Sequence, residues 1–208
     1  MIIREDFSKT SDRIPRDKVE RIVKGLLRDG KLMQACYVAM SFNIGTRVSD
    51  TLDFTWEILL SNSGTFKQEL FIVEKKTEKV SGKKPRHIAF SNSTLQLLKI
   101  YWDFLGNPTS GYLFVNRQGE RLSERYVNIF LKDLNVSYLG KNRIKNFSSH
   151  SLRKGFAYDF YLKHGRSIYS LNVLQKVLNH SDIGVTLTYL GISQKEMDKA
   201  YNTDINVF

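Results

Sequence analysis

The chain has 208 residues, 41% of them hydrophobic, so it is long enough and apolar enough to bury one compact core. Its formal net charge of +11 favours a polyanionic partner, although a basic balance by itself is equally compatible with a merely soluble surface. The single cysteine, Cys36, excludes an internal disulfide, and no apolar stretch reaches the length of a membrane span, so composition favours a soluble cytoplasmic protein.

The first part of the chain is predicted to be helical. Residues 1–13 are polar and aperiodic, which is typical of an arm or linker. Pro15 opens one helical pattern, and a second helix is predicted to run to Gly45. Arg47 then begins a short third helix just after a glycine turn, where its side chain and backbone N–H groups can face one anion. Asp50 follows one turn later, so Arg47 could instead be a surface arginine paired with Asp50.

The next part of the chain changes to β-type patterns. Runs at 55–60, 66–73 and 86–90 predict a three-stranded antiparallel sheet. Its last connection is predicted to be an exposed loop rich in lysines, namely Lys75, Lys76, Lys79, Lys83 and Lys84. Most of these lysines could simply solvate the surface, but a lysine hairpin could also deliver a proton to bound DNA.

Helical patterns return in the second half, at 94–105, 124–134, 151–164 and 168–178, and Tyr189 is expected on or just after a short helix. The predicted fold class is therefore α+β, mostly helical, with a small antiparallel sheet at one edge.

Four residues of the second half form a pattern suited to phosphate chemistry. His150 and Arg153 are three residues apart on a predicted helix, so both side chains can reach one anion. His180 follows, and Tyr189 comes nine residues after it. A His-x-x-Arg pair alone occurs often by chance, whereas the order and spacing of all four are specific.

Together with Arg47, this pattern resembles the tyrosine recombinases, also called the phage integrase family. Residues 44–50 and 150–189 are similar to the two conserved boxes of that family. The resemblance implies that Asp50 is the acidic companion of the first arginine, and that the catalytic residues are Arg47, Lys76, His150, Arg153, His180 and Tyr189. Asn179 stands where the family usually has glycine, and asparagine can adopt the same left-handed backbone conformation.

The residue types fit transfer of a phosphodiester. The planar guanidinium groups of Arg47 and Arg153 suit the oxygens of the scissile phosphate. Tyr189 would be the nucleophile, His150 would help to deprotonate it, and His180 would donate to a phosphate oxygen. By resemblance, Lys76 would protonate the leaving 5′ oxygen and a 3′-phosphotyrosyl enzyme would form.

Neither a metal nor another cofactor is expected. Asp50, Asp53 and Glu57 share the first region without a histidine or a second acidic motif at ligand spacing. A glycine-rich loop followed by Gly-Lys-Ser/Thr, which would indicate a nucleotide triphosphate site, does not occur in the sequence.

The resemblance also implies an organisation and a set of partners. Residues 14–192 would form the catalytic domain, and residues 193–208 a tail that could be exchanged between subunits. Double-stranded DNA would be the partner, contacted by Lys75, Lys79, Lys83, Lys84 and Lys154. The protein would be a monomer in solution and a tetramer on paired sites, with accessory DNA-bending proteins possible, in the nucleoid of a bacterial or phage-infected cell.

Three alternatives remain open from the sequence. The family usually has a helical clamp domain before the catalytic one, so this chain is either a naturally short member or the catalytic part of a longer protein. A catalytically silent DNA-binding relative would act as a regulator. A type IB topoisomerase would relax supercoils as a monomer, without paired sites.

Overall fold

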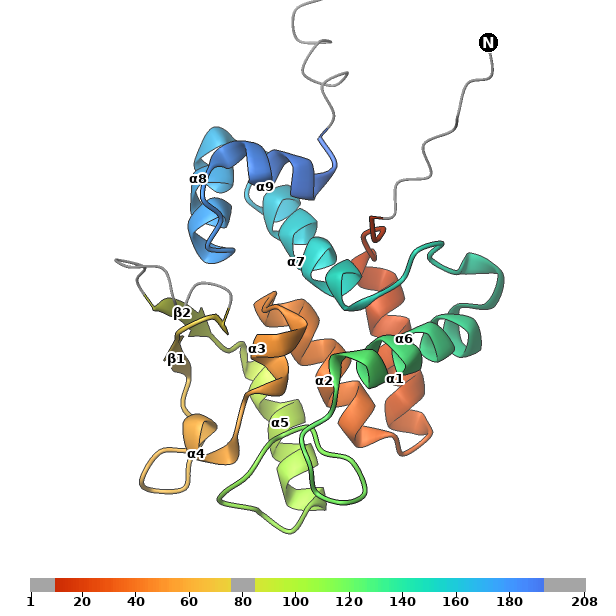
Figure 1. Ribbon diagram of the computed structural model, residues 1–208, viewed down its shortest axis with the longest axis vertical. Coiled ribbons are helices and arrows are strands. Elements are labelled where there is room, and N and C mark those ends of the chain that lie inside the picture. Colours follow the sequence, from red (N-terminus) through yellow and green to blue (C-terminus); the bar gives the residue numbers. More distant parts are fainter. Residues whose placement is uncertain (1–9, 76–84, 193–208) are drawn as a thin grey trace, which may run out of the picture. The chain divides into compact units, whose positions relative to one another are not determined.

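The computed structural model describes residues 10–75 and 85–192. The chain divides into two compact units, one ending at Phe156 and the other beginning at Ala157. None of the described helices is long and apolar enough to cross a bilayer. The elements of Figure 1 follow in this order: α1 (Arg16–Arg28), α2 (Leu32–Ile44), α3 (Val48–Leu52), α4 (Trp56–Leu59), β1 (Glu69–Ile72), β2 (Arg86–Ala89), α5 (Asn92–Phe104), α6 (Glu124–Leu139), η2 (Gly140–Asn142), α7 (Ser149–Lys163), α8 (Ile168–Val177) and α9 (Ile183–Leu190).

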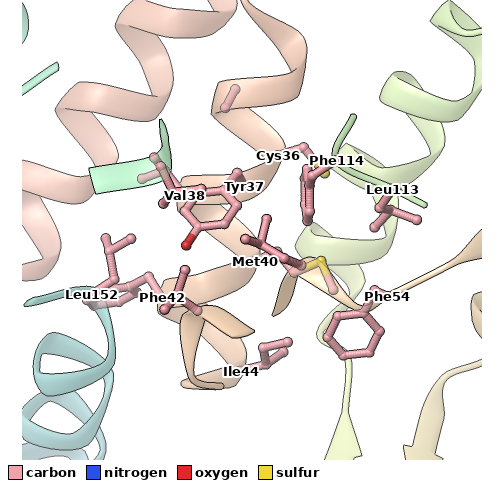
Figure 2. Packing of buried hydrophobic residues seen from close by; sticks show 14 of the residues in the cluster. Cys36, Tyr37, Val38, Met40, Phe42, Ile44, Phe54, Leu113, Phe114 and Leu152 are labelled. Carbon is pink, nitrogen blue, oxygen red and sulfur yellow. The ribbon is translucent and has the colours of Figure 1, made fainter. Parts of the chain in front are cut away.

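Helix α2 lies in the core of the first unit. It is apolar on nearly every side and packs against α1 and α5, as expected of a fully buried helix. Tyr37, which projects from α2, meets the rings of Phe114 and Phe130 edge to face at centroid distances of 5.3 and 5.4 Å. Figure 2 shows Tyr37, Met40 and Phe42 among Phe114 and other buried side chains. The core thereby fixes the direction in which α2 leaves toward Gly45.

Hydroxyl caps explain where helices α5 and α6 of the first unit begin. Ser91 accepts a hydrogen bond from the Thr94 N–H at 3.3 Å and starts α5, while Ser123 accepts from the Tyr126 N–H at 3.1 Å and starts α6. The sequence predicted both helices, and α6 runs five residues beyond the predicted end to Leu139.

The sheet has two strands, so the prediction of three strands was wrong. The middle of segment 55–60 forms helix α4, because Trp56 and Leu59 are both buried at a spacing of one helical turn. A strand would have placed these two residues on opposite faces. Only the two ends of this run make isolated bridges, Thr55 with Tyr112 and Leu60 with Phe66. The β-branched and aromatic residues of the segment gave the β-type pattern, and core packing overrode it.

Strands β1 and β2 pair antiparallel, with Leu70 opposite Ile88 and Ile72 opposite Arg86. Their side chains alternate between the core and solvent. This alternation turns Arg86 to the core side with Ile88, and it continues past β1, so that Glu74 is also buried. Two charged residues of the hairpin are therefore inside the first unit.

The second unit contains α8 and α9. Helix α8 ends at Val177, and the chain turns away at Asn179, whose φ of +53° confirms the predicted left-handed conformation. The following His180 N–H donates to the Gln175 carbonyl at 3.0 Å and closes the helix end. Asp182 caps α9 by accepting from the Val185 N–H at 3.0 Å. Tyr189 lies on α9, as expected.

Candidate active site

Arg47 is positioned by the turn between α2 and α3. Gly45 ends α2 with a φ of +58°, a conformation that side chains disfavour, and Arg47 is the residue before α3. Thr51 donates its hydroxyl to the Arg47 carbonyl at 3.0 Å and lies 2.6 Å from the Thr46 hydroxyl. The predicted start of a short helix at Arg47 is confirmed, and the backbone of this arginine is fixed on both sides.

Glu74 is the acidic partner of the Arg47 side chain. Arg47 Nη1 donates to Glu74 Oε2 at 2.5 Å, and the carboxylate is fully buried, while 19% of the Arg47 side chain is exposed. Within residues 10–75 and 85–192, Glu74 is the one hydrogen-bond acceptor of this guanidinium group. The edge formed by Nε and Nη2 therefore remains available to an anion from solvent.

Arg153 and Arg86 meet the other oxygen of the same carboxylate. Glu74 Oε1 lies 3.0 Å from Arg86 Nη1 and 3.5 Å from Arg153 Nη1. Both arginines also donate to the Gly45 carbonyl, at 2.8 Å from Arg153 and 3.3 Å from Arg86. Arg86 Nη2 donates in addition to the Ile44 carbonyl. Arg47 and Arg153, which are far apart in sequence, thus converge at one carboxylate.

The charged groups of this cluster shift one another's pKa values. Burial by itself would raise the pKa of Glu74, but the nearby charges of Arg47, Arg153 and Arg86 outweigh it and hold that pKa below its ordinary value. Burial, together with the charge of Arg153, lowers the pKa of Arg86 to about 10. Glu74 is therefore ionised at neutral pH, where an arginine side chain always carries its charge. Three cations around one anion leave a net charge of +2, which favours binding of a phosphate.

His150 and Arg153 lie on α7, as the spacing predicted. The helix begins at a serine cap in which Ser148 Oγ accepts from the His150 N–H at 3.2 Å and the Ser148 N–H donates to Ser151 Oγ at 3.0 Å. The His150 residue is exposed, yet partial desolvation of its ring and the charges of Arg153, Lys154 and Arg47 lower its pKa. Its imidazole is therefore neutral at pH 7 and can accept a proton.

Asp50 contacts the hairpin. Its Oδ1 accepts from the Lys75 N–H at 3.0 Å, and burial raises the pKa of its carboxyl. One turn later, Asp53 Oδ2 lies 2.6 Å from Lys75 Nζ. The ion pair of Arg47 is thus made with Glu74, and Asp50 instead fastens the chain just before the lysine loop to α3.

His180 and Tyr189 come together in the second unit. Their ring centroids are 5.3 Å apart and their planes are inclined by 72°. His180 Nδ1 lies 3.0 Å from the Thr186 hydroxyl, so α9 orients this imidazole. The predicted spacing of nine residues therefore does bring the two side chains into contact.

The predicted DNA-binding lysines are only partly described by the structure. Lys154 Nζ donates to the Ser11 carbonyl at 2.9 Å, and Lys75 forms the ion pair with Asp53. The remaining hairpin lysines, Lys76, Lys79, Lys83 and Lys84, lie outside the described residues.

Sequence reasoning missed Glu74 and Arg86. The signal was present in the strand period, since alternation from Leu70 and from Ile88 places each of them on the core side. Two opposite charges predicted to be buried in one hairpin indicate that they pair.

Comparison with known proteins identifies the family of this chain. A family model described as the phage integrase family matches residues 12–196. The tyrosine recombinase XerC of Xanthomonas axonopodis pv. citri is 27% identical over 176 residues, which cover 85% of this chain and 50% of that protein. The tyrosine recombinase XerD of Staphylococcus saprophyticus is 29% identical over 126 residues, 58% of this chain and 40% of that protein. The chain spans about half the length of the relatives it matches.

Solved structures share the fold. The XerA recombinase superposes with a TM-score of 0.65 at 19% identity, over 94% of this chain and 66% of that one. The Tn1549 transposon integrase, solved in complex with transposon right end DNA, gives a TM-score of 0.66 at 15% identity, over 95% of this chain and 68% of that one. Because the family model matches residues 12–196 and both boxes fall within that range, the chain belongs to the phage integrase family.

Proposed function

We propose that this chain is the catalytic part of a site-specific DNA recombinase or integrase, which cleaves and rejoins strands of double-stranded DNA through a 3′-phosphotyrosyl intermediate. The observation that carries the proposal is the convergence of Arg47 and Arg153 on Glu74, with the Arg47 side chain partly exposed to solvent. Two guanidinium groups so arranged suit the non-bridging oxygens of one phosphodiester and the charge that grows on them during transfer.

In the proposed reaction, the Tyr189 oxygen forms a bond to phosphorus as the bond from phosphorus to the 5′ oxygen breaks. Lys76 gives a proton to the departing 5′ oxygen, and His150 takes the proton of the phenol. The lowered pKa of His150 supports this role, because only a neutral imidazole can accept a proton. In the second step the 5′ hydroxyl of another strand attacks the phosphotyrosyl link and restores Tyr189.

His180 is assigned a role on the phosphate. A Thr186 hydroxyl that donates to Nδ1 leaves the ring proton on Nε2, from which it can be donated to a phosphate oxygen. The bond energy of the DNA strand is kept in the phosphotyrosyl link, so the scheme requires neither a metal nor a nucleotide triphosphate.

We assign residues 14–192 to the catalytic domain and residues 193–208 to a tail that docks on a neighbouring subunit. Strand exchange needs four active sites, so we expect a tetramer on paired sites and a monomer in free solution, in the cytoplasm near the nucleoid. Lysines of the hairpin and Lys154 would contact backbone phosphates. Each such contact should steepen the slope of log affinity against log salt by about 0.9.

Covalent trapping tests the proposal. The protein is incubated with nicked duplexes drawn from the DNA that flanks its gene, with a chelator present, and the products are separated on a denaturing gel. Wild type should give a slow-migrating, protease-sensitive adduct, and Tyr189→Phe should give none. Tyr169→Phe is the matched control, since it removes the same hydroxyl from an exposed position of the second unit.

Other outcomes would reassign the chain. Salt-sensitive DNA binding without an adduct on any of these duplexes would indicate a catalytically silent relative. An adduct accompanied by relaxation of supercoiled plasmids that lack paired sites would indicate a type IB topoisomerase. An adduct that persists in Tyr189→Phe would exclude this tyrosine as the nucleophile.

A further inference from the structure

We propose that Glu74 is a positioning residue that orients Arg47 for the scissile phosphate and joins the chain just after β1 to both Arg47 and Arg153. The inference rests on the proposed function of this site.

The carboxylate is held from both sides. Its Oε2 accepts from Arg47 Nη1, and its Oε1 accepts from Arg86 Nη1 and faces Arg153. Arg86 in turn donates to the carbonyls of Ile44 and Gly45, in the turn that precedes Arg47. The turn, Arg86, Glu74 and Arg47 thus form a closed ring of hydrogen bonds that determines where the Arg47 guanidinium lies.

Glu74 and a phosphate can bind Arg47 at the same time. Glu74 accepts from the Nη1 corner of the Arg47 guanidinium, so an incoming phosphate can bind the edge formed by Nε and Nη2 without displacing the carboxylate. A fork held at one corner also loses little rotational freedom when it binds an oxyanion at the other edge. Glu74 therefore orients the phosphate-binding edge and does not compete for it.

Glu74 also lies at the start of the lysine loop. Glu74 directly precedes Lys75, whose N–H and Nζ are held by Asp50 and Asp53 on and next to α3. The proposed acid, Lys76, is the next residue in the chain. Glu74 therefore ties the point from which the lysine loop departs to the arginines that would hold the phosphate.

The competing explanation is that Glu74 only neutralises the buried charge of Arg86. A paired substitution separates the two explanations, namely Glu74→Gln combined with Arg86→Met. It removes one cation and one anion, so the cluster keeps its net charge of +2, and replacing both partners of a buried pair is far better tolerated than removing one. Glu69→Gln is the matched control, because it removes a carboxylate from an exposed position of β1. Glu74→Asp is the conservative variant.

The first measurement is single-turnover adduct formation over a titration of nicked DNA, with thermal melting to verify the fold. In the paired variant the maximal rate should fall by at least tenfold, while the DNA concentration at half-maximal rate stays within twofold of wild type. The maximal rate of Glu74→Asp should lie between those of the paired variant and wild type. The maximal rate of Glu69→Gln should match that of wild type. A paired variant that folds and cleaves at the wild-type rate would overturn the proposal. Should the paired variant fail to fold, a wild-type rate in Glu74→Asp would overturn it.

The second measurement does not depend on cleavage. In ¹⁵N spectra of the arginine side chains, the two Arg47 Nη signals should be resolved in wild type, because rotation of the guanidinium group is slow. In the paired variant the rotation should be fast and the two signals should merge into one average. Restricted Arg47 signals in the paired variant would refute positioning by Glu74. If wild type forms no adduct on any DNA, the proposed function fails, and the side-chain spectra alone decide whether Glu74 orients Arg47.

Discussion

Replacing Gly45 by alanine should destabilise the first unit through two separate effects. The φ of +58° disfavours any L side chain and should cost about 1–2 kcal/mol. A Cβ at this position would also overlap the ring of Phe156, and such overpacking costs about 1–3 kcal/mol. The free energy of unfolding should therefore fall by about 3 kcal/mol in urea melts followed by circular dichroism, and Tm by roughly 6–12 °C.

Gly30→Ala is the matched control for this prediction. Gly30 has a similar φ of +69°, but a Cβ there would meet nothing within 4 Å, so only the backbone cost of about 1–2 kcal/mol should remain. Adding Phe156→Leu to Gly45→Ala should recover part of the difference between the two glycines. Equal losses at Gly45 and Gly30, or no recovery on trimming Phe156, would refute the steric explanation.

Three further predictions concern single residues. Asn179→Ala should be less stable than Asn179→Gly by about 1 kcal/mol in thermal melts, because both variants lack the side-chain amide and only alanine has a Cβ in the left-handed conformation; equal stability would contradict this. Burial raises the pKa of Cys36 to about 12, so a thiol reagent at pH 8 should label it only when urea unfolds the chain; fast labelling in native buffer would contradict this. Because burial raises the pKa of Asp50, the wild type loses stability as pH rises from about 3.8 through that pKa. Asp50→Asn should therefore melt higher at pH 7, with the gain vanishing below pH 3.8; a lower Tm at pH 7 would contradict this.

Local sequence determines much of the secondary structure of this protein. Helix starts at prolines and serines, the glycine turn before Arg47 and the left-handed Asn179 all follow from conformational preferences of a few neighbouring residues. The pairing of His150 with Arg153 on one helix follows from the helical period, and the family boxes identified the remaining candidates.

The tertiary structure decided which partners the charged residues take. The sequence placed Asp50 beside Arg47 by proximity, yet Glu74 pairs with Arg47, because the strand alternation buries Glu74 and Arg86 and a buried charge needs an ionic partner. Segment 55–60 became a helix for a similar reason, since only that conformation turns both Trp56 and Leu59 to the core. Strand alternation in the sequence indicates that Glu74 and Arg86 are buried, but only the tertiary structure brings Arg47 to Glu74 and turns segment 55–60 into a helix, because both depend on packing against residues distant in the chain.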